Sequence, residues 1–194
     1  MRSKQHNIHG MRLAIIAVLL FPLLLTNFVK ASTNSNNWQK ISEAKATWLW
    51  LDIYKAELYV DAAAELSEYT EKQLLADGVP LTLKLCYLVN LSSEQIIQAA
   101  NEVLPDKIDN NKLATSVNEL HNRYQNVTEG DCYSLQHHQN GSTQLILNKQ
   151  ILFHTKTLNF KELYFGIWLG NNPLSVDLKN QLLKFQSSVK LKVR

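Results

Sequence analysis

Residues 47–60, TWLWLDIYKAELYV, form the longest run of strand-favouring residues in the chain and decide its fold class. Strict alternation places both tryptophans, Asp52 and Tyr54 on one face of a single strand, and the opposite face is aliphatic as far as Ile53. Because both faces of its first half are apolar, we expect that half to be central and covered on two sides. One face of the second half turns polar, as in a strand that emerges into solvent.

Shorter predicted elements surround this strand. Further strands are expected at residues 38–44, 81–89, 132–138, 143–148 and 151–155, with an edge strand at 189–193. Helices are expected at residues 92–104, 110–125, 159–169 and 175–185, with a surface helix or long loop at 61–78. Strands, two helices, a meander of strands and two more helices make an α+β protein, in which helices cover one face of an antiparallel sheet.

Local motifs mark the boundaries of these elements. Ser92 and Gln95 have the spacing of a capping box at the start of a helix. Asn159 is expected to cap a later helix, with Glu162 three residues on. The dipeptide Asn140-Gly141 is a strong signal for a β-hairpin turn.

The N-terminus is typical of a secretory signal peptide. Residues 1–31 contain basic residues without acidic ones, an apolar run from Leu13, and small residues before Ser32 that fit a cleavage site. Spanning a bilayer needs about 20 apolar residues, and this run is shorter. We therefore expect cleavage, a leader at residues 32–37, and one domain at residues 38–194 in an oxidising compartment, the periplasm. An uncleaved anchor is the alternative, and either Met1 or Met11 can be the start.

Removing residues 1–31 changes the charge of the chain. They contain four of its 20 basic residues and none of its 17 acidic residues. The remaining chain is nearly neutral, so no basic surface points to nucleic acid. No later segment is long and apolar enough to span a membrane, and no spacing of histidines and cysteines predicts a metal site. We expect no cofactor.

Cys86 and Cys132 are the only two cysteines, and both follow the predicted signal peptide. An even number of cysteines in an exported chain permits a disulfide. Two separate thiols in the core are the alternative, because the sequence does not show whether the two Cα atoms come within reach.

Five segments, in this order, resemble the chalcone isomerase-like family and, more narrowly, its exported bacterial branch. They are WLWLDIYKAELYV at 48–60, PLTLKLCYLVNLSSEQI at 80–96, GDCYSLQ at 130–136, GSTQLILN at 141–148 and YFGIWLGNNPLSVDLKNQLL at 164–183. The resemblance implies an open-faced β-sandwich, with a long antiparallel sheet, a layer of helices and an apolar cleft between them.

The resemblance also implies two kinds of function. Plant members isomerise a flavonoid with a cation and hydroxyl groups near the substrate oxygen, and non-catalytic relatives bind a fatty acid through an Arg and a Tyr. After residue 31 this chain has only Arg123 and Arg194, neither on the early strand where the family's cleft arginine belongs, and Ser92 or Ser93 stands where the isomerases have their reactive tyrosine. Lys45, Lys55 and Lys84 are the remaining candidates for a cation.

The expected ligand-binding residues are Trp50, Asp52, Tyr54, Tyr87 and Trp168, with ordinary core roles as the alternative. Asp52 is the best polar candidate, because a carboxylate among aromatic side chains needs a partner or a shifted pKa. We expect a periplasmic, non-enzymatic domain that binds a small apolar or fatty-acid-like molecule. A cofactor-free lyase or isomerase and a partner-binding protein of the cell envelope are the alternatives, and the sequence sets neither the ligand nor the oligomeric state.

Overall fold

A computed structural model describes residues 37–62 and 70–185. The predicted signal peptide, the leader up to residue 36 and the predicted strand at 189–193 lie outside these residues. In the described part of the chain, six strands form one antiparallel sheet in sequence order: β1 (Trp38–Trp48), β2 (Leu51–Asp61), β3 (Leu81–Tyr87), β4 (Cys132–His137), β5 (Thr143–Leu147) and β6 (Gln150–Thr155). The same residues contain five helices: α1 (Glu71–Leu75), α2 (Ser93–Asn101), α3 (Asn111–His121), α4 (Phe160–Leu169) and α5 (Val176–Leu182).

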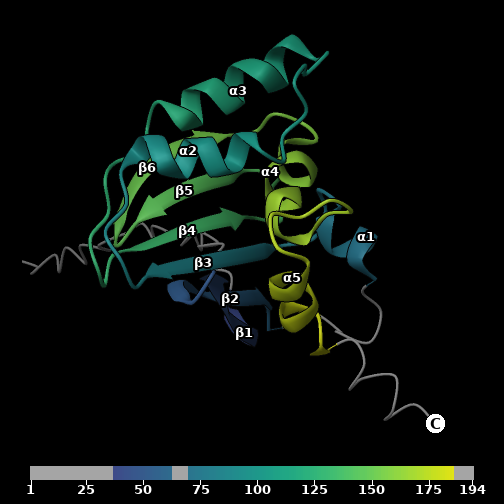
Figure 1. The fold of residues 1–194 in the computed structure, drawn as a ribbon. Helices are drawn as coiled ribbons and strands as arrows, with labels where there is room; N and C mark the ends of the chain where they lie inside the picture. Colours follow the sequence, from purple (N-terminus) through teal and green to yellow (C-terminus); the bar gives the residue numbers. More distant parts are fainter. Residues whose placement is uncertain (1–36, 63–69, 186–194) are drawn as a thin grey trace, which may run out of the picture. The chain divides into compact units, whose positions relative to one another are not determined.

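The expected α+β class and open-faced arrangement are confirmed. Alternate residues of β2 to β5 are buried beneath the helices, with Leu58, Leu83, Leu135 and Leu145 in the centre of the core. Figure 1 shows α2 to α5 packed over one face of the sheet. A helix layer on one face explains why the strands alternate between buried and more polar positions.

The prediction of one strand across residues 47–60 is wrong. The chain turns back at Leu49 and Trp50, and Trp48 pairs with Leu51 to close a hairpin between β1 and β2. The expected covering on both sides is also wrong, because Trp48 to Leu51 are all exposed. The apolar residues of this segment misled the prediction, since a two-residue hairpin turn ordinarily contains Gly, Asn or Asp.

Of the two helix caps predicted from the sequence, one is confirmed and the other is wrong. The Ser92 hydroxyl accepts from the Gln95 amide at 3.2 Å, and the Gln95 side chain accepts from the Ser92 amide, so the capping box is confirmed. Asn159 precedes α4 but makes no capping hydrogen bond through its side chain. The Asn159 backbone is left-handed, with φ 64°, and its backbone N–H donates to the Asp77 carboxylate.

A disulfide joins Cys86 and Cys132, which are 46 residues apart. The two residues face each other directly in the ladder between β3 and β4, with a Cα–Cα distance of 4.0 Å. Tyr87, the last residue of β3, follows Cys86 immediately, so the crosslink lies beside the tyrosines described next.

Candidate functional site

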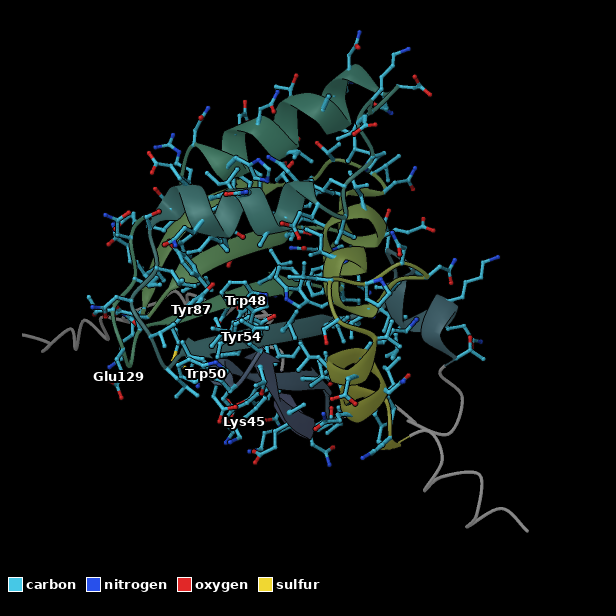
Figure 2. The ribbon with its side chains drawn as sticks, in the orientation of Figure 1. Lys45, Trp48, Trp50, Tyr54, Tyr87 and Glu129 are labelled. Atoms are coloured by element: carbon cyan, nitrogen blue, oxygen red, sulfur yellow. A yellow bond between two sulfur atoms is a disulfide. The ribbon has the colours of Figure 1, made fainter. Side chains whose placement is uncertain are left out.

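Aromatic side chains gather between the sheet and the helices at the end of the sheet where β2 begins and β3 ends. Tyr54 and Tyr87 face each other across these strands, with ring centroids 5.8 Å apart in an edge-to-face arrangement. Trp168 of α4 donates from its indole nitrogen to the Tyr54 hydroxyl at 3.1 Å. The structure therefore brings together three of the five expected site residues, and Figure 2 labels the two tyrosines.

Three further tyrosines, none of them predicted from the sequence to be a site residue, extend this group. Tyr133 packs edge-to-face on Tyr87 at 6.2 Å and on Tyr124 at 5.1 Å. Tyr164 of α4 donates to the Tyr124 hydroxyl at 3.1 Å. We call these five tyrosines and Trp168 the tyrosine cluster. Tyr124 and Tyr164 fitted the apolar stripes of helices, and no sequence signal distinguished them from ordinary core residues.

The hydroxyls of the cluster differ in how they are satisfied. The Tyr133 hydroxyl donates to the backbone carbonyl of Gln125 and accepts from the backbone N–H of the same residue. The Tyr87 side chain is only 3% exposed, and its hydroxyl oxygen is not one of the fully buried polar atoms that lack a hydrogen-bond partner in the described residues, which are on Thr82, His121 and His138. The Tyr54 hydroxyl accepts from Trp168, which leaves its own proton available to an acceptor. No acceptor for the protons of the Tyr54 and Tyr87 hydroxyls is recorded among the described residues, so both protons can be offered to a ligand oxygen.

Burial sets the protonation state of these phenols. It raises the pKa of Tyr54 to about 12, although the hydrogen bond from Trp168 acts in the opposite direction. Burial also raises the pKa of Tyr87 well above its usual value, and the neighbouring tyrosines add to the effect. Both phenols are therefore neutral at physiological pH. They can donate a hydrogen bond to a ligand oxygen, but they cannot act as bases.

The other two expected site residues, Trp50 and Asp52, lie elsewhere. Trp50 is in the β1–β2 turn and not in a strand. A register shift in β2 places Asp52 opposite Thr47, whereas Tyr54 pairs with the buried Ala46 on the other face. The expectation that Trp50, Asp52 and Tyr54 share one strand face is therefore wrong.

Asp52 has polar partners on the open face of the sheet. It accepts hydrogen bonds from Lys45 at 2.5 Å and from Thr47 at 2.8 Å. These hydrogen bonds lower the pKa of its carboxyl, the one from Lys45 contributing most. Lys45 and Thr47 thus supply, from the same chain, the polar partners that the Asp52 carboxylate needs.

The candidate cations also lie on this open face. Lys55 pairs with Glu43 and Glu57, and Lys84 pairs with Glu57. Together with Lys45, these are the three lysines that sequence analysis offered as ligand partners, and each is engaged with a carboxylate on the side of the sheet away from the helices. A ligand at Tyr54 and Tyr87 would meet phenol donors before it met any of these lysines.

A buried lysine and a buried histidine serve the fold. Lys161 of α4 donates to the carbonyls of Leu74, Ala76 and Val79, which fixes the chain after α1 against α4. Burial lowers the pKa of Lys161 to about 7. His137 is held at both ring nitrogens, by Thr143 and by the Asp77 carbonyl. Within residues 37–62 and 70–185, no group of three or more His, Cys, Asp or Glu side chains could hold a metal ion.

A groove of about 880 Å³ lies beside α4 and is lined also by residues of α1 and α3. Its lining contains five aliphatic and six polar residues: Leu75, Val103, Leu104, Leu113 and Leu163, and Thr70, Lys72, Asn159, Glu162, Asn171 and Asn172. Gly166 also lines it, and a Cβ at Gly166 would meet nothing within 4 Å. No member of the tyrosine cluster lines this groove, which is therefore a separate place where an apolar molecule could lie.

Comparison with known proteins bears on the fold and the family. A model of the chalcone isomerase-like family matches residues 46–184. Comparison with curated protein sequences found no match. Among solved structures, the chain is similar to the crystal structure of a fatty-acid binding protein of Arabidopsis thaliana, AtFAP1, with a TM-score of 0.59, 13% identity, and coverage of 81% of this chain and 91% of that one. At that identity the likeness shows a shared fold. On its arrangement of strands and helices and on the match across residues 46–184, this chain belongs to the chalcone isomerase-like family.

Proposed function

We propose that this chain is an exported, non-enzymatic domain of the family's bacterial branch that binds a small apolar molecule carrying a hydrogen-bond-acceptor oxygen. The observation that carries the proposal is the pair of phenols at Tyr54 and Tyr87. Both are buried and neutral, and both have unused donor capacity. Apolar surroundings with a few well-placed polar groups are typical of sites for small molecules.

The ligand chemistry follows from these donors. Two neutral phenols suit a carbonyl, an ester or the head group of a fatty acid, and the fold likeness to a fatty-acid binding protein supports an acyl ligand. Because Lys45, Lys55 and Lys84 are paired on the open face, charge attraction contributes little to recognition. An ester and a carboxylate of equal chain length should therefore bind with similar affinity.

The same residues weigh against catalysis. General acid–base catalysis works best with a group whose pKa lies near the working pH. The pKa values of Tyr54 and Tyr87 are raised far above that range. Ser92, near the position of the family's reactive tyrosine, is occupied in the capping box of α2. The site offers hydrogen-bond donors, and because the candidate lysines are paired on the other face of the sheet, the cation that the isomerases use beside such donors is not supplied by them, which favours binding.

The export part of the proposal rests on residues 1–31 and on the disulfide. Disulfides persist in oxidising compartments and are rare in the cytosol, and the Cys86–Cys132 bond is consistent with a periplasmic protein. In the part of the chain that the structure describes, no helix has the length and apolar character to cross a bilayer. N-terminal sequencing of protein recovered from the periplasm tests cleavage before Ser32. An N-terminus at Met1 or Met11 would contradict it.

The binding experiment is a titration with dodecanoate and with methyl dodecanoate, followed by native mass spectrometry and isothermal calorimetry. The double variant Tyr54→Phe/Tyr87→Phe should weaken both ligands by about tenfold or more, because it removes two donors worth roughly 1 kcal/mol each. The matched control is Tyr59→Phe, the same change at a hydroxyl that bonds Glu57. It should leave the affinity unchanged.

A third variant separates the tyrosine pair from the groove on α4. Gly166→Leu places a side chain in that groove and should not alter binding. Loss of binding in Gly166→Leu with retention in the double Phe variant would move the site to the groove. No binding of either probe by the wild-type chain would refute the proposed function, and turnover of a chalcone would establish the isomerase instead.

A further inference from the structure

The tip of the β1–β2 hairpin is formed entirely by large apolar residues. Trp48, Leu49 and Trp50 are 70%, 79% and 87% exposed, and Leu51 is 43% exposed. Within residues 37–62 and 70–185, the other exposed large apolar residues each stand alone in the sequence: Leu88, Ile151, Leu158 and Val176. Single exposed apolar residues are ordinary on protein surfaces, whereas a contiguous group marks an interaction site.

The backbone of the tip is strained in a way that stability does not explain. Leu49 has φ 57°, a left-handed conformation that bulky residues rarely adopt. The β5–β6 hairpin has the same kind of two-residue turn, and there the corresponding residue is Asn148, with φ 55°. Asn tolerates this conformation and Leu does not. A strained residue kept at an exposed position points to a function for its side chain.

A polar layer lies directly behind the apolar tip. Thr47 pairs with Asp52 one step below the Trp48–Leu51 pair, and Lys45 donates to Asp52. The apolar part has one strand residue and one turn residue on each side, which at about 3.3 Å per residue extends at most roughly 7 Å. Amphipathic helices that lie in a membrane interface bury their apolar face about 5–10 Å into the boundary between head groups and acyl chains. The length of the tip fits that depth, with the polar layer at the level of the head groups.

Size and charge favour a lipid surface over a protein partner. A stable protein interface buries about 800 Å² on each side, which is more than a four-residue turn can supply. A bilayer needs no complementary groove, and tryptophan is enriched at the membrane–water boundary because its ring is amphipathic. Lys45 and Asp52 neutralise each other, so insertion does not require anionic lipid.

We propose that residues 48–51 form a membrane-contact tip that inserts into the interfacial layer of a phospholipid bilayer. The tip gives the domain a reversible attachment to membranes, and it does so independently of ligand binding at the tyrosine cluster. Leu49 and Trp50 enter the acyl boundary, and the polar layer of Lys45, Thr47 and Asp52 stays among the head groups.

The test uses protein without its signal peptide and vesicles of POPC, alone or mixed with POPG. Wild-type protein should sediment with both kinds of vesicle, and lipid-bound nitroxide should quench its tryptophan fluorescence. Leu49→Asn/Trp50→Ser should lower the partition coefficient about tenfold or more, because it removes two of the four apolar side chains. This variant places at position 49 the residue type found at Asn148, so the hairpin should still form, and an unchanged melting temperature checks that it does.

Leu158→Ser is the matched control, since Leu158 is 74% exposed and lies outside the tip. It should bind vesicles like the wild-type chain. Equal vesicle binding by wild type and Leu49→Asn/Trp50→Ser would overturn the proposal, as would binding confined to POPG vesicles and abolished by salt. A dimer of wild-type protein that the tip variant dissolves would also overturn it, and would assign the tip to contact between two copies of the chain.

Discussion

The β1–β2 and β5–β6 hairpins share a geometry and differ in chemistry. Both use a two-residue turn whose first residue has a positive φ, 57° at Leu49 and 55° at Asn148. The Asn148 side chain accepts from the Cys132 amide at 2.9 Å and donates to Asp131 at 3.0 Å, so that turn is tied to β4. Among the described residues, no side-chain hydrogen bond ties Leu49 or Trp50 to the rest of the fold.

The difference shows which turn is shaped by stability and which by contact with something outside the chain. Asn148 relieves the backbone strain and adds hydrogen bonds, and it lies beside a strand fixed by the disulfide. Leu49 relieves nothing and exposes an apolar side chain. Residues that weaken the fold without an internal gain are expected where a protein meets its partner or ligand.

The largest expected effect is on the β5–β6 side of the comparison, where the disulfide fixes the neighbouring strand β4. Replacing both Cys86 and Cys132 with Ala should lower the free energy of unfolding by about 4 kcal/mol, because the disulfide constrains a long loop of the unfolded chain. Urea unfolding of the variant, and of the wild-type chain with and without reductant, measures this loss. A difference below about 1 kcal/mol would mean that the crosslink adds nothing to the strand pairing between β3 and β4.

The next largest effect is expected when the β5–β6 turn receives the apolar residue found in the β1–β2 turn. Asn148→Leu should cost about 2 kcal/mol, because it forces Leu into a left-handed conformation and removes the hydrogen bonds to Cys132 and Asp131. Chemical denaturation followed by circular dichroism measures it. Lys149→Ala, at the next position of the same turn, is the control and should be neutral. Equal stability of all three proteins would remove the contrast between the turns.

A pH-dependent effect of intermediate size arises on the open face beside β1 and β2. Burial by itself raises the pKa of Glu57, but the hydrogen bond from Tyr59 and the charges of Lys84 and Lys40 outweigh it and lower the value to about 2. Because the folded-state pKa lies below its ordinary value, Glu57 contributes stability that is present above about pH 4.5 and is lost as the pH falls toward 2.

We expect that loss to be about 1 kcal/mol, and stability curves between pH 5 and 2 measure it. In Glu57→Gln the curve should be flatter across that range. An identical slope in the wild-type and variant curves would show that other carboxylates account for the acid sensitivity.

The smallest effect is expected when the β1–β2 turn receives the Asn found in the β5–β6 turn. Leu49→Asn alone should raise the free energy of unfolding by about 0.5–1 kcal/mol, because Asn adopts the left-handed conformation with less strain. Urea unfolding detects a change of this size. Destabilisation of the variant would show that Leu49 contributes to the fold, and the argument for an external contact would lose its support.

Hydrophobic alternation was enough to predict the class of fold but not the first hairpin. The strands and helices from Leu81 onward follow from periodicity and from motifs such as Ser92-x-x-Gln95 and Asn140-Gly141. The turn at Leu49 and Trp50 could not be found in this way, because turn prediction relies on Gly, Asn, Asp and Pro. Leu49 and Trp50, which indicate the proposed membrane contact, are also the residues whose apolar character predicted a continuous strand in place of a turn.

The site was predicted only in part, for a related reason. Tyr54, Tyr87 and Trp168 are brought together because each follows the alternation of its own strand or helix. Asp52 lies on the other face because of a register shift between Ala46 and Thr47, and periodicity carries no information on such a shift. Which hydroxyls are satisfied depends on contacts between distant segments, such as Tyr133 with Gln125 and Tyr164 with Tyr124.

The most direct test of the proposed function is an NMR measurement with 13C-labelled dodecanoate. Intermolecular NOEs to the aromatic protons of Tyr54 and Tyr87, together with a shifted carboxyl resonance that is lost in Tyr54→Phe/Tyr87→Phe, are the result we predict. NOEs to the side chains of Leu163 and Leu113 in the groove on α4, or a carboxyl resonance identical to that of the free acid, would contradict it.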